Sequence, residues 1–155
     1  MLILGIDPGF ADTGWGVIEK KGNDLSLVDY GVIKTSTKLD FIARLEIIHQ
    51  DLTRVIKKFK PEKVAVEQLF FAKNVKTALL VGQARGVVLL TIMEEKLPLL
   101  EYTPLQVKQA VCSYGRAEKT QIQKMVKVLL QMKDIPRPDD AADALAIAIC
   151  CANSN

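Results

Sequence analysis

The sequence predicts an α/β fold in which helices flank one mixed sheet of five strands. Three observations predict it. Short apolar runs bounded by turn signals open the chain, segments with helical spacing then alternate with apolar runs, and the last third reads as helices. The 155 residues suit one domain, 1–155, that is large enough to bury a substantial core. We therefore expect a three-stranded antiparallel meander followed by two parallel strands.

The meander is predicted from the first 33 residues. Residues 2–6 form an apolar run that stops at the turn signal Asp-Pro-Gly at 7–9. Residues 14–18 give a second strand and residues 25–33 a third. The polar segment 21–24 between them suits a hairpin.

The middle of the chain alternates helix and strand. Residues 39–59 carry apolar side chains at helical spacing, and Pro61 ends that helix. Residues 63–67 are almost wholly apolar, as expected for a strand covered on both faces. A long helix at 75–96 and a short strand at 99–102 follow. Three further helices are expected at 104–112, 118–132 and 139–152.

Composition narrows the class of protein. The net charge of +3 is a mild basic bias that does not by itself establish a nucleic-acid partner. The three cysteines are too few for a disulfide framework and suit a reducing compartment. No secretion signal is recognisable at the start, and the apolar stretch 78–93 is interrupted by Gln83 and Arg85. We expect a soluble, cytoplasmic protein with no membrane partner.

Four carboxylates lie where folding alone gives little reason to place them: Asp7, Glu67, Asp140 and Asp143. Each follows or interrupts an apolar run, and burying a carboxylate without a partner is unfavourable. Four converging acids would repel one another unless a cation lay among them. The pattern therefore indicates a site for hard divalent metal ions.

Structural explanations remain open for each acid. Asp7 could simply start a turn, and Glu67 could cap the helix after it. Asp140 suits a helix N-terminus, where capping and the helix dipole favour an acid. Asp143 is harder to explain, because the helix around it is nearly all apolar. The glycine-rich stretch after Asp7 also leaves room for a phosphate or a backbone to approach closely.

Six motifs carry a resemblance to a known family: GIDPGFADTGWG, VAVEQLFFAKN, GQARGVVL, VKQAV, AEKTQIQKMV and DDAADALAIAI. In order and spacing the chain resembles the RuvC family of Holliday-junction resolvases over essentially its whole length. The resemblance implies an RNase H-like fold, a homodimer, and Mg²⁺-dependent cleavage of two strands of a four-way DNA junction. It also implies two ions per active site, for which Mn²⁺ can substitute, and a branch-migration helicase partner of the RuvA and RuvB type. The family's catalytic, metal-binding acids fall on the same four carboxylates.

The resemblance extends to basic and aromatic residues. Lys108 and Lys119 match lysines near the cleaved phosphate, although both also read as solvated lysines on helix surfaces. Phe70 matches the family's base-stacking aromatic residue, whereas Phe71 is expected in the core. The other expected DNA contacts are Lys73, Asn74, Lys76 and Arg116.

A stripe of small residues runs along the predicted helix 75–96, at Ala78, Gly82 and Gly86. Glycine inside a helix is unfavourable by about 0.5–1 kcal/mol relative to alanine, so the stripe predicts close approach of another helix. A symmetry-related copy of the same helix is one candidate partner. Tight packing within one chain is the alternative.

The sequence thus predicts a dimeric, metal-dependent endonuclease that resolves four-way DNA junctions. One alternative is a YqgF-like nuclease of the same fold acting on RNA, disfavoured by the residues 68–70 and the GQARG motif. A junction-binding module without catalysis is a second, disfavoured by the four intact acids. A kinase-like phosphate-binding relative is a third, for which the chain is too short.

Overall fold

The computed structural model describes residues 1–68 and 74–154. Its centre is a five-stranded sheet in the order β3-β2-β1-β4-β5. The strands β1 to β3 form an antiparallel meander, while β4 pairs parallel to β1 and β5 parallel to β4. The predicted mixed sheet is therefore confirmed. The strands are β1 (Leu2–Asp7), β2 (Asp12–Lys21), β3 (Asp24–Lys34), β4 (Lys63–Glu67) and β5 (Leu99–Tyr102).

The hairpin between β2 and β3 follows its expected turn. Gly22 lies there with φ of +60°, a conformation that glycine adopts without a steric penalty. Strand β2 is longer than the predicted 14–18, because its polar ends still pair with β3 from Asp12 to Lys21. The apolar run in the sequence marks only the buried middle of that strand.

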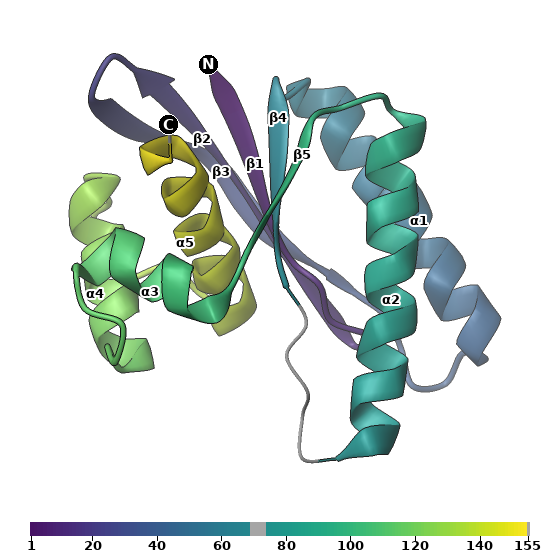
Figure 1. The fold of residues 1–155 in the computed structure, drawn as a ribbon. Coiled ribbons are helices and arrows are strands. Elements are labelled where there is room, and N and C mark those ends of the chain that lie inside the picture. Colours follow the sequence, from purple (N-terminus) through teal and green to yellow (C-terminus); the bar gives the residue numbers. More distant parts are fainter. Residues whose placement is uncertain (69–73, 155) are drawn as a thin grey trace.

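The helices form two layers, one on each face of the sheet (Figure 1). Helices α1 and α2 cover one face, and α3, α4 and α5 cover the other. Helix α4 ends three residues before its predicted boundary, since the chain turns at 130–132. The bounds are α1 (Phe41–Phe59), α2 (Val75–Glu94), α3 (Pro104–Cys112), α4 (Lys119–Leu129) and α5 (Asp139–Asn153).

Alternation along β1 separates two cores. Ile3 packs toward α3, α4 and α5, whereas Leu4 and Ile6 pack toward α1 and α2. Helix α5 is buried from Ala144 to Ala152, which explains why its sequence is nearly all apolar.

Two glycines let α5 lie directly on the sheet. A Cβ on Gly14 of β2 would come within 2.0 Å of the backbone oxygen of Asp140, and a Cβ on Gly5 of β1 within 2.1 Å of that of Ala144. The space that the glycine-rich segment leaves is thus filled by the backbone of α5. The first turn of α5 is thereby held beside the carboxyl end of β1.

Helix α2 is long and apolar enough to cross a membrane, judged by length and composition only. Of the 18 residues in its most apolar stretch, 22% are buried in this monomer. Composition alone does not distinguish such a span from a helix that a protein partner covers. The interruptions at Gln83 and Arg85 therefore do not exclude a membrane span by composition, contrary to the expectation from the sequence.

Candidate active site and metal centre

The four predicted acids come to one end of the sheet. Asp7 ends β1 and Glu67 ends β4, one position beyond the paired Ile6 and Val66. Parallel neighbours end at the same edge, so the two carboxylates are brought together there. Asp140 and Asp143 enter from the first turns of α5, which Gly14 holds against β2.

The charges of these acids are coupled. Burial and, after it, the negative charges of Asp143, Glu67 and Asp140 together raise the pKa of Asp7 from 3.8 to about 7. Burial, then the charge of Asp143, also raises the pKa of Glu67. Four carboxylates sharing one site without a strong cation produce this pattern.

Lysines supply the positive charge in this structure. The Lys119 ammonium lies 3.1 Å from Asp143 Oδ2 and 3.5 Å from Asp139 Oδ2. Burial raises the pKa of Asp143, and the Lys119 hydrogen bond acts in the opposite direction. Asp143 is therefore paired with a lysine here.

The donor chemistry fits a hard divalent cation, because carboxylate oxygens are the ligands that Mg²⁺ prefers. Within residues 1–68 and 74–154, however, no three acidic, histidine or cysteine side chains are already arranged to hold one ion. Burial and the neighbouring negative charges raise the pKa of Asp7, and a cation among these acids would favour its ionised form. In donor chemistry and charge the residues therefore fit a metal centre.

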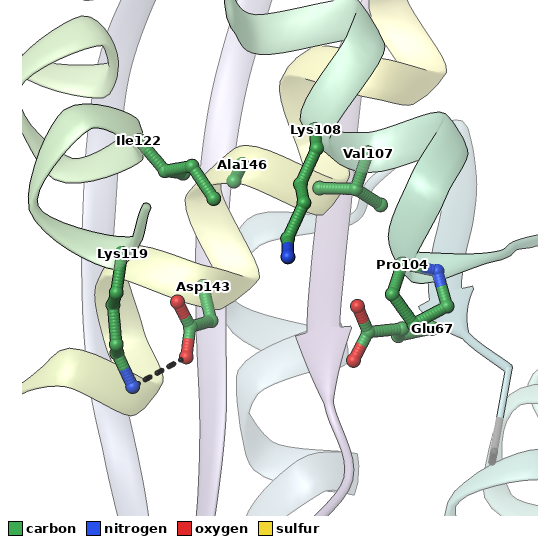
Figure 2. Close-up of a pocket in the computed structure, with 8 residues that line it drawn as sticks. All are labelled: Glu67, Pro104, Val107, Lys108, Lys119, Ile122, Asp143 and Ala146. Carbon is green, nitrogen blue, oxygen red and sulfur yellow. Dashed lines mark ion pairs between the residues drawn. The ribbon is translucent and has the colours of Figure 1, made fainter. Parts of the chain in front are cut away.

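A pocket of about 240 Å³ opens between these groups (Figure 2). Glu67 and Asp143 face it from opposite sides, and Lys108 of α3 points between them. The positive charge of Lys108 acts to lower the pKa of Glu67. Lys119 and four apolar residues complete the lining: Pro104, Val107, Ile122 and Ala146. A charged group entering here would be partly withdrawn from water, which strengthens its interaction with the lysines.

A second pocket adjoins Glu67 and includes Asp7 and Arg85 of α2. Arg85 Nε donates to the backbone oxygen of Glu67 at 3.4 Å, and its guanidinium forms an ion pair with Glu101. Arg85 thus braces the end of β4. An arginine interrupting an apolar helix was the available sequence signal, but the sequence did not reveal its partner.

The segment after Asp7 is held by a buried network. Arg44 is 9% exposed, stacks over the Phe10 ring at 3.8 Å and donates to Thr35 Oγ1 at 2.9 Å. Thr35 in turn donates to the backbone oxygen of Phe10 at 2.7 Å. This network fixes the loop that leaves Asp7, and nothing in the sequence pattern singled it out.

The remaining predicted site residues lie farther out. Lys76 and Arg116 are exposed. Asn74 caps α2, since its side-chain oxygen accepts from Lys76 N at 3.0 Å. Phe70, Phe71 and Lys73 lie outside the described residues.

Comparison with known proteins gives one consistent answer. The family model described as crossover junction endodeoxyribonuclease RuvC matches residues 3–151. A protein of that name from Halothermothrix orenii is 58% identical over 99% of this chain and 93% of its own length. Its counterpart from Ruminiclostridium cellulolyticum is 52% identical over 100% of this chain and 93% of its own.

Solved structures agree. Thermus thermophilus RuvC in complex with a Holliday junction substrate superimposes with a TM-score of 0.92 at 41% identity, covering 97% of this chain and 92% of that one. The yeast mitochondrial Holliday junction resolvase Ydc2, 18% identical with a TM-score of 0.71, shares the fold. The sheet with its flanking helices is thus the RNase H-like fold of RuvC, as expected. On sequence and fold, the chain belongs to the RuvC family of crossover junction endodeoxyribonucleases.

Proposed function

We propose that this chain resolves four-way DNA junctions by metal-dependent hydrolysis of a phosphodiester in each of two opposed strands. The observation that carries the proposal is the gathering of Asp7, Glu67, Asp140 and Asp143 at one end of the sheet. Membership of the RuvC family supports the substrate and the reaction. It also disfavours the RNA-directed and non-catalytic alternatives.

We propose that the four acids hold two Mg²⁺ ions, with Mn²⁺ as a substitute. Asp7 would serve both ions, Glu67 one of them, and Asp140 with Asp143 the other. When bound, two such ions activate the attacking water and stabilise charge on the departing 3′ oxygen. Burial and the neighbouring carboxylates raise the pKa of Asp7 to about 7, which supports this assignment, because divalent charge would offset the repulsion among the acids.

The chain's own cations complete the mechanism. Lys108 points into the pocket between Glu67 and Asp143, where it would neutralise the phosphate that is cut. Lys119 lies on the far side of Asp143 and would meet the same phosphate or the next one. The apolar lining limits water around these charges, so each contact counts for more than on open surface.

DNA contacts outside the pocket are proposed from the resemblance to the RuvC family. We propose that Phe70 stacks on bases near the cut, and that Lys73, Asn74 and Lys76 meet the backbone at the start of α2. Arg116 would meet it from the loop between α3 and α4.

We propose a homodimer formed through α2. Leu79, Leu90 and Met93 on its outer face are 64%, 59% and 59% exposed, and a Cβ on Gly86 would touch nothing within 4 Å. Tight packing within one chain therefore does not explain Gly86. A second copy of α2 would bury this face and place two active sites about one two-fold axis, as two symmetric cuts require.

Three further assignments complete the proposal. We take residues 1–155 as one nuclease domain. We place the protein in the cytoplasm, and we expect a branch-migration helicase of the RuvA and RuvB type to deliver its substrate. The apolar face of α2 is assigned to the dimer and not to a membrane.

The decisive test compares a mobile four-way junction, a linear duplex and an RNA hairpin, each with and without Mg²⁺. Paired symmetric nicks confined to the junction and requiring the metal are expected. Asp7→Asn should abolish cutting while junction binding persists. Cutting by Asp7→Asn, or cutting in EDTA, would contradict the metal-site assignment.

A further inference from the structure

Lys119 is held by two acids, of which only one belongs to the predicted metal ligands. Its Nζ lies 3.1 Å from Asp143 Oδ2 and 3.5 Å from Asp139 Oδ2. Figure 2 shows the first of these ion pairs at the rim of the pocket. Lys119 begins α4, whereas both acids lie in the first turns of α5.

Asp139 is itself held in place from α4. Its Oδ1 accepts a hydrogen bond of 3.0 Å from Gln123 Nε2, and Gln123 is only 7% exposed. One carboxylate oxygen is therefore fixed by a buried amide, while the other faces the ammonium. Asp139 thus offers Lys119 a partner that does not depend on what Asp143 binds.

Asp143 is the contested partner. A divalent ion and an ammonium are both cations that bind carboxylate oxygen, and Asp143 Oδ2 is the atom that Lys119 contacts. In this structure the acids are not arranged around one point, and Asp143 is turned to Lys119. An ion that took Oδ2 of Asp143 as a ligand would compete with the ammonium for that oxygen.

We infer that Lys119 is the counter-ion of Asp143 until a divalent ion displaces it, and that Asp139 then retains it beside the pocket. This inference rests on the proposed metal site and deepens it. Asp139 acts as a positioning residue, because it keeps the ammonium near the phosphate after the ion has entered. The flexible four-carbon stem of lysine allows the small shift from one carboxylate to the other.

The first experiment measures Mn²⁺ binding without DNA by isothermal titration at low salt. Lys119→Met removes the competitor, and Lys124→Met removes the same charge from an exposed position of α4 outside the site. Because ion pairs of this exposure contribute up to about 1 kcal/mol, Lys119→Met should bind about three- to fivefold more tightly than Lys124→Met. Equal affinities in the two variants would overturn the inference.

The second experiment follows the ε-methylene signal of Lys119 by NMR during a Mg²⁺ titration. In the unmodified protein the signal should shift yet keep the relaxation of an ordered side chain. In Asp139→Asn, which preserves the acceptor for Gln123, it should become as mobile as an exposed lysine once Mg²⁺ is added. A Lys119 signal that Mg²⁺ leaves unchanged, or one equally ordered in Asp139→Asn, would overturn the role of Asp139.

The two proposals fail in different ways. If the unmodified protein binds no Mn²⁺, the metal site itself is wrong. If it binds Mn²⁺ and Lys119→Met matches Lys124→Met, the metal site stands and only the displacement of Lys119 is wrong.

Discussion

Asp7 is the acid of the site whose ionisation is most strongly opposed by its surroundings. Its carboxyl is buried at a strand end, and three neighbouring carboxylates oppose its ionisation. The positive charge of Lys119 offsets this only in part, since the pKa of Asp7 still stands at about 7. Removing that charge should therefore stabilise the metal-free protein while abolishing its activity.

Asp7→Asn should change how stability depends on pH. The pKa of about 7 in the folded protein lies above the ordinary aspartate pKa of 3.8, so the folded state holds the proton more strongly between these values. Stability of the metal-free protein should fall as pH rises from about 4 to 7 and stay low above that. The asparagine variant lacks this loss and should be more stable at about pH 8, by on the order of a few kcal/mol.

Thermal unfolding in EDTA at about pH 5.5 and pH 8 measures this. Asp24→Asn, an exposed acid in the β2–β3 hairpin near the start of β1 and so at the opposite end of that strand from Asp7, serves as the control and should leave the profile unchanged. A melting temperature of Asp7→Asn that equals that of the unmodified protein at pH 8 would contradict the assignment.

Lys108→Met should act on the chemical step. Its ammonium reaches into the pocket between Glu67 and Asp143, and the methionine retains most of the side-chain volume. We expect single-turnover cleavage to slow by about 10²-fold, while junction affinity changes by less than about threefold. Loss of affinity without loss of the single-turnover rate would instead make Lys108 a binding residue only.

At the scale of elements, the sequence predicted each strand and helix that the structure describes in residues 1–68 and 74–154, and the reason is visible in the sheet. Strand β4 and helix α5 are mostly buried, so their nearly all-apolar composition predicted both elements from the sequence. Patterning also located the four acids, because each breaks such a run. It could not pair Arg85 with Glu101 or Asp139 with Gln123, since those partners meet only after packing.

Gly14→Ala tests how α5 positions the acids. The new methyl group would need space that the backbone oxygen of Asp140 occupies at 2.0 Å. We expect a loss of about 2–4 kcal/mol in the free energy of unfolding, because the backbone of β2 or of α5 would have to shift to make room for the methyl group. Cleavage should fall even under conditions where the variant is fully folded. Urea unfolding and a cleavage assay at low temperature separate the two effects.

Leu90→Asp tests the outer face of α2. The side chain is 59% exposed in the monomer, so a charge there should leave the monomer's fold intact. If α2 packs on its own copy, the variant should shift from dimer to monomer in sedimentation and lose paired cutting. Val128→Asp on α4, where the side chain is 65% exposed, is the matched control and should leave the mass unchanged. An unshifted mass for Leu90→Asp would reject this dimer face.

At the scale of the whole molecule, negative charge is concentrated at the active site and positive charge predominates on the remaining surface. The net charge is +3 although several acids are collected at one end of the sheet, so the rest of the surface is more basic than the total indicates. Such a surface attracts the DNA backbone broadly, while the site selects where chemistry occurs.

Junction binding should accordingly weaken as salt rises. Each phosphate contact contributes a slope of roughly −0.9 in log affinity against log salt for duplex DNA. If Arg116 makes one such contact, Arg116→Met should lower the slope by about one and weaken all junction sequences alike. An unchanged slope, measured by fluorescence anisotropy without divalent metal, would remove Arg116 from the interface.

The contact of α5 with the two glycines has a consequence for heat resistance. Asp7 and Asp140 are positioned by backbone lying directly against backbone, with no side chains between that could loosen first. The acids should therefore keep their mutual placement until the sheet itself comes apart. Thermal inactivation should then coincide with global unfolding, and no inactive yet folded form should accumulate on warming.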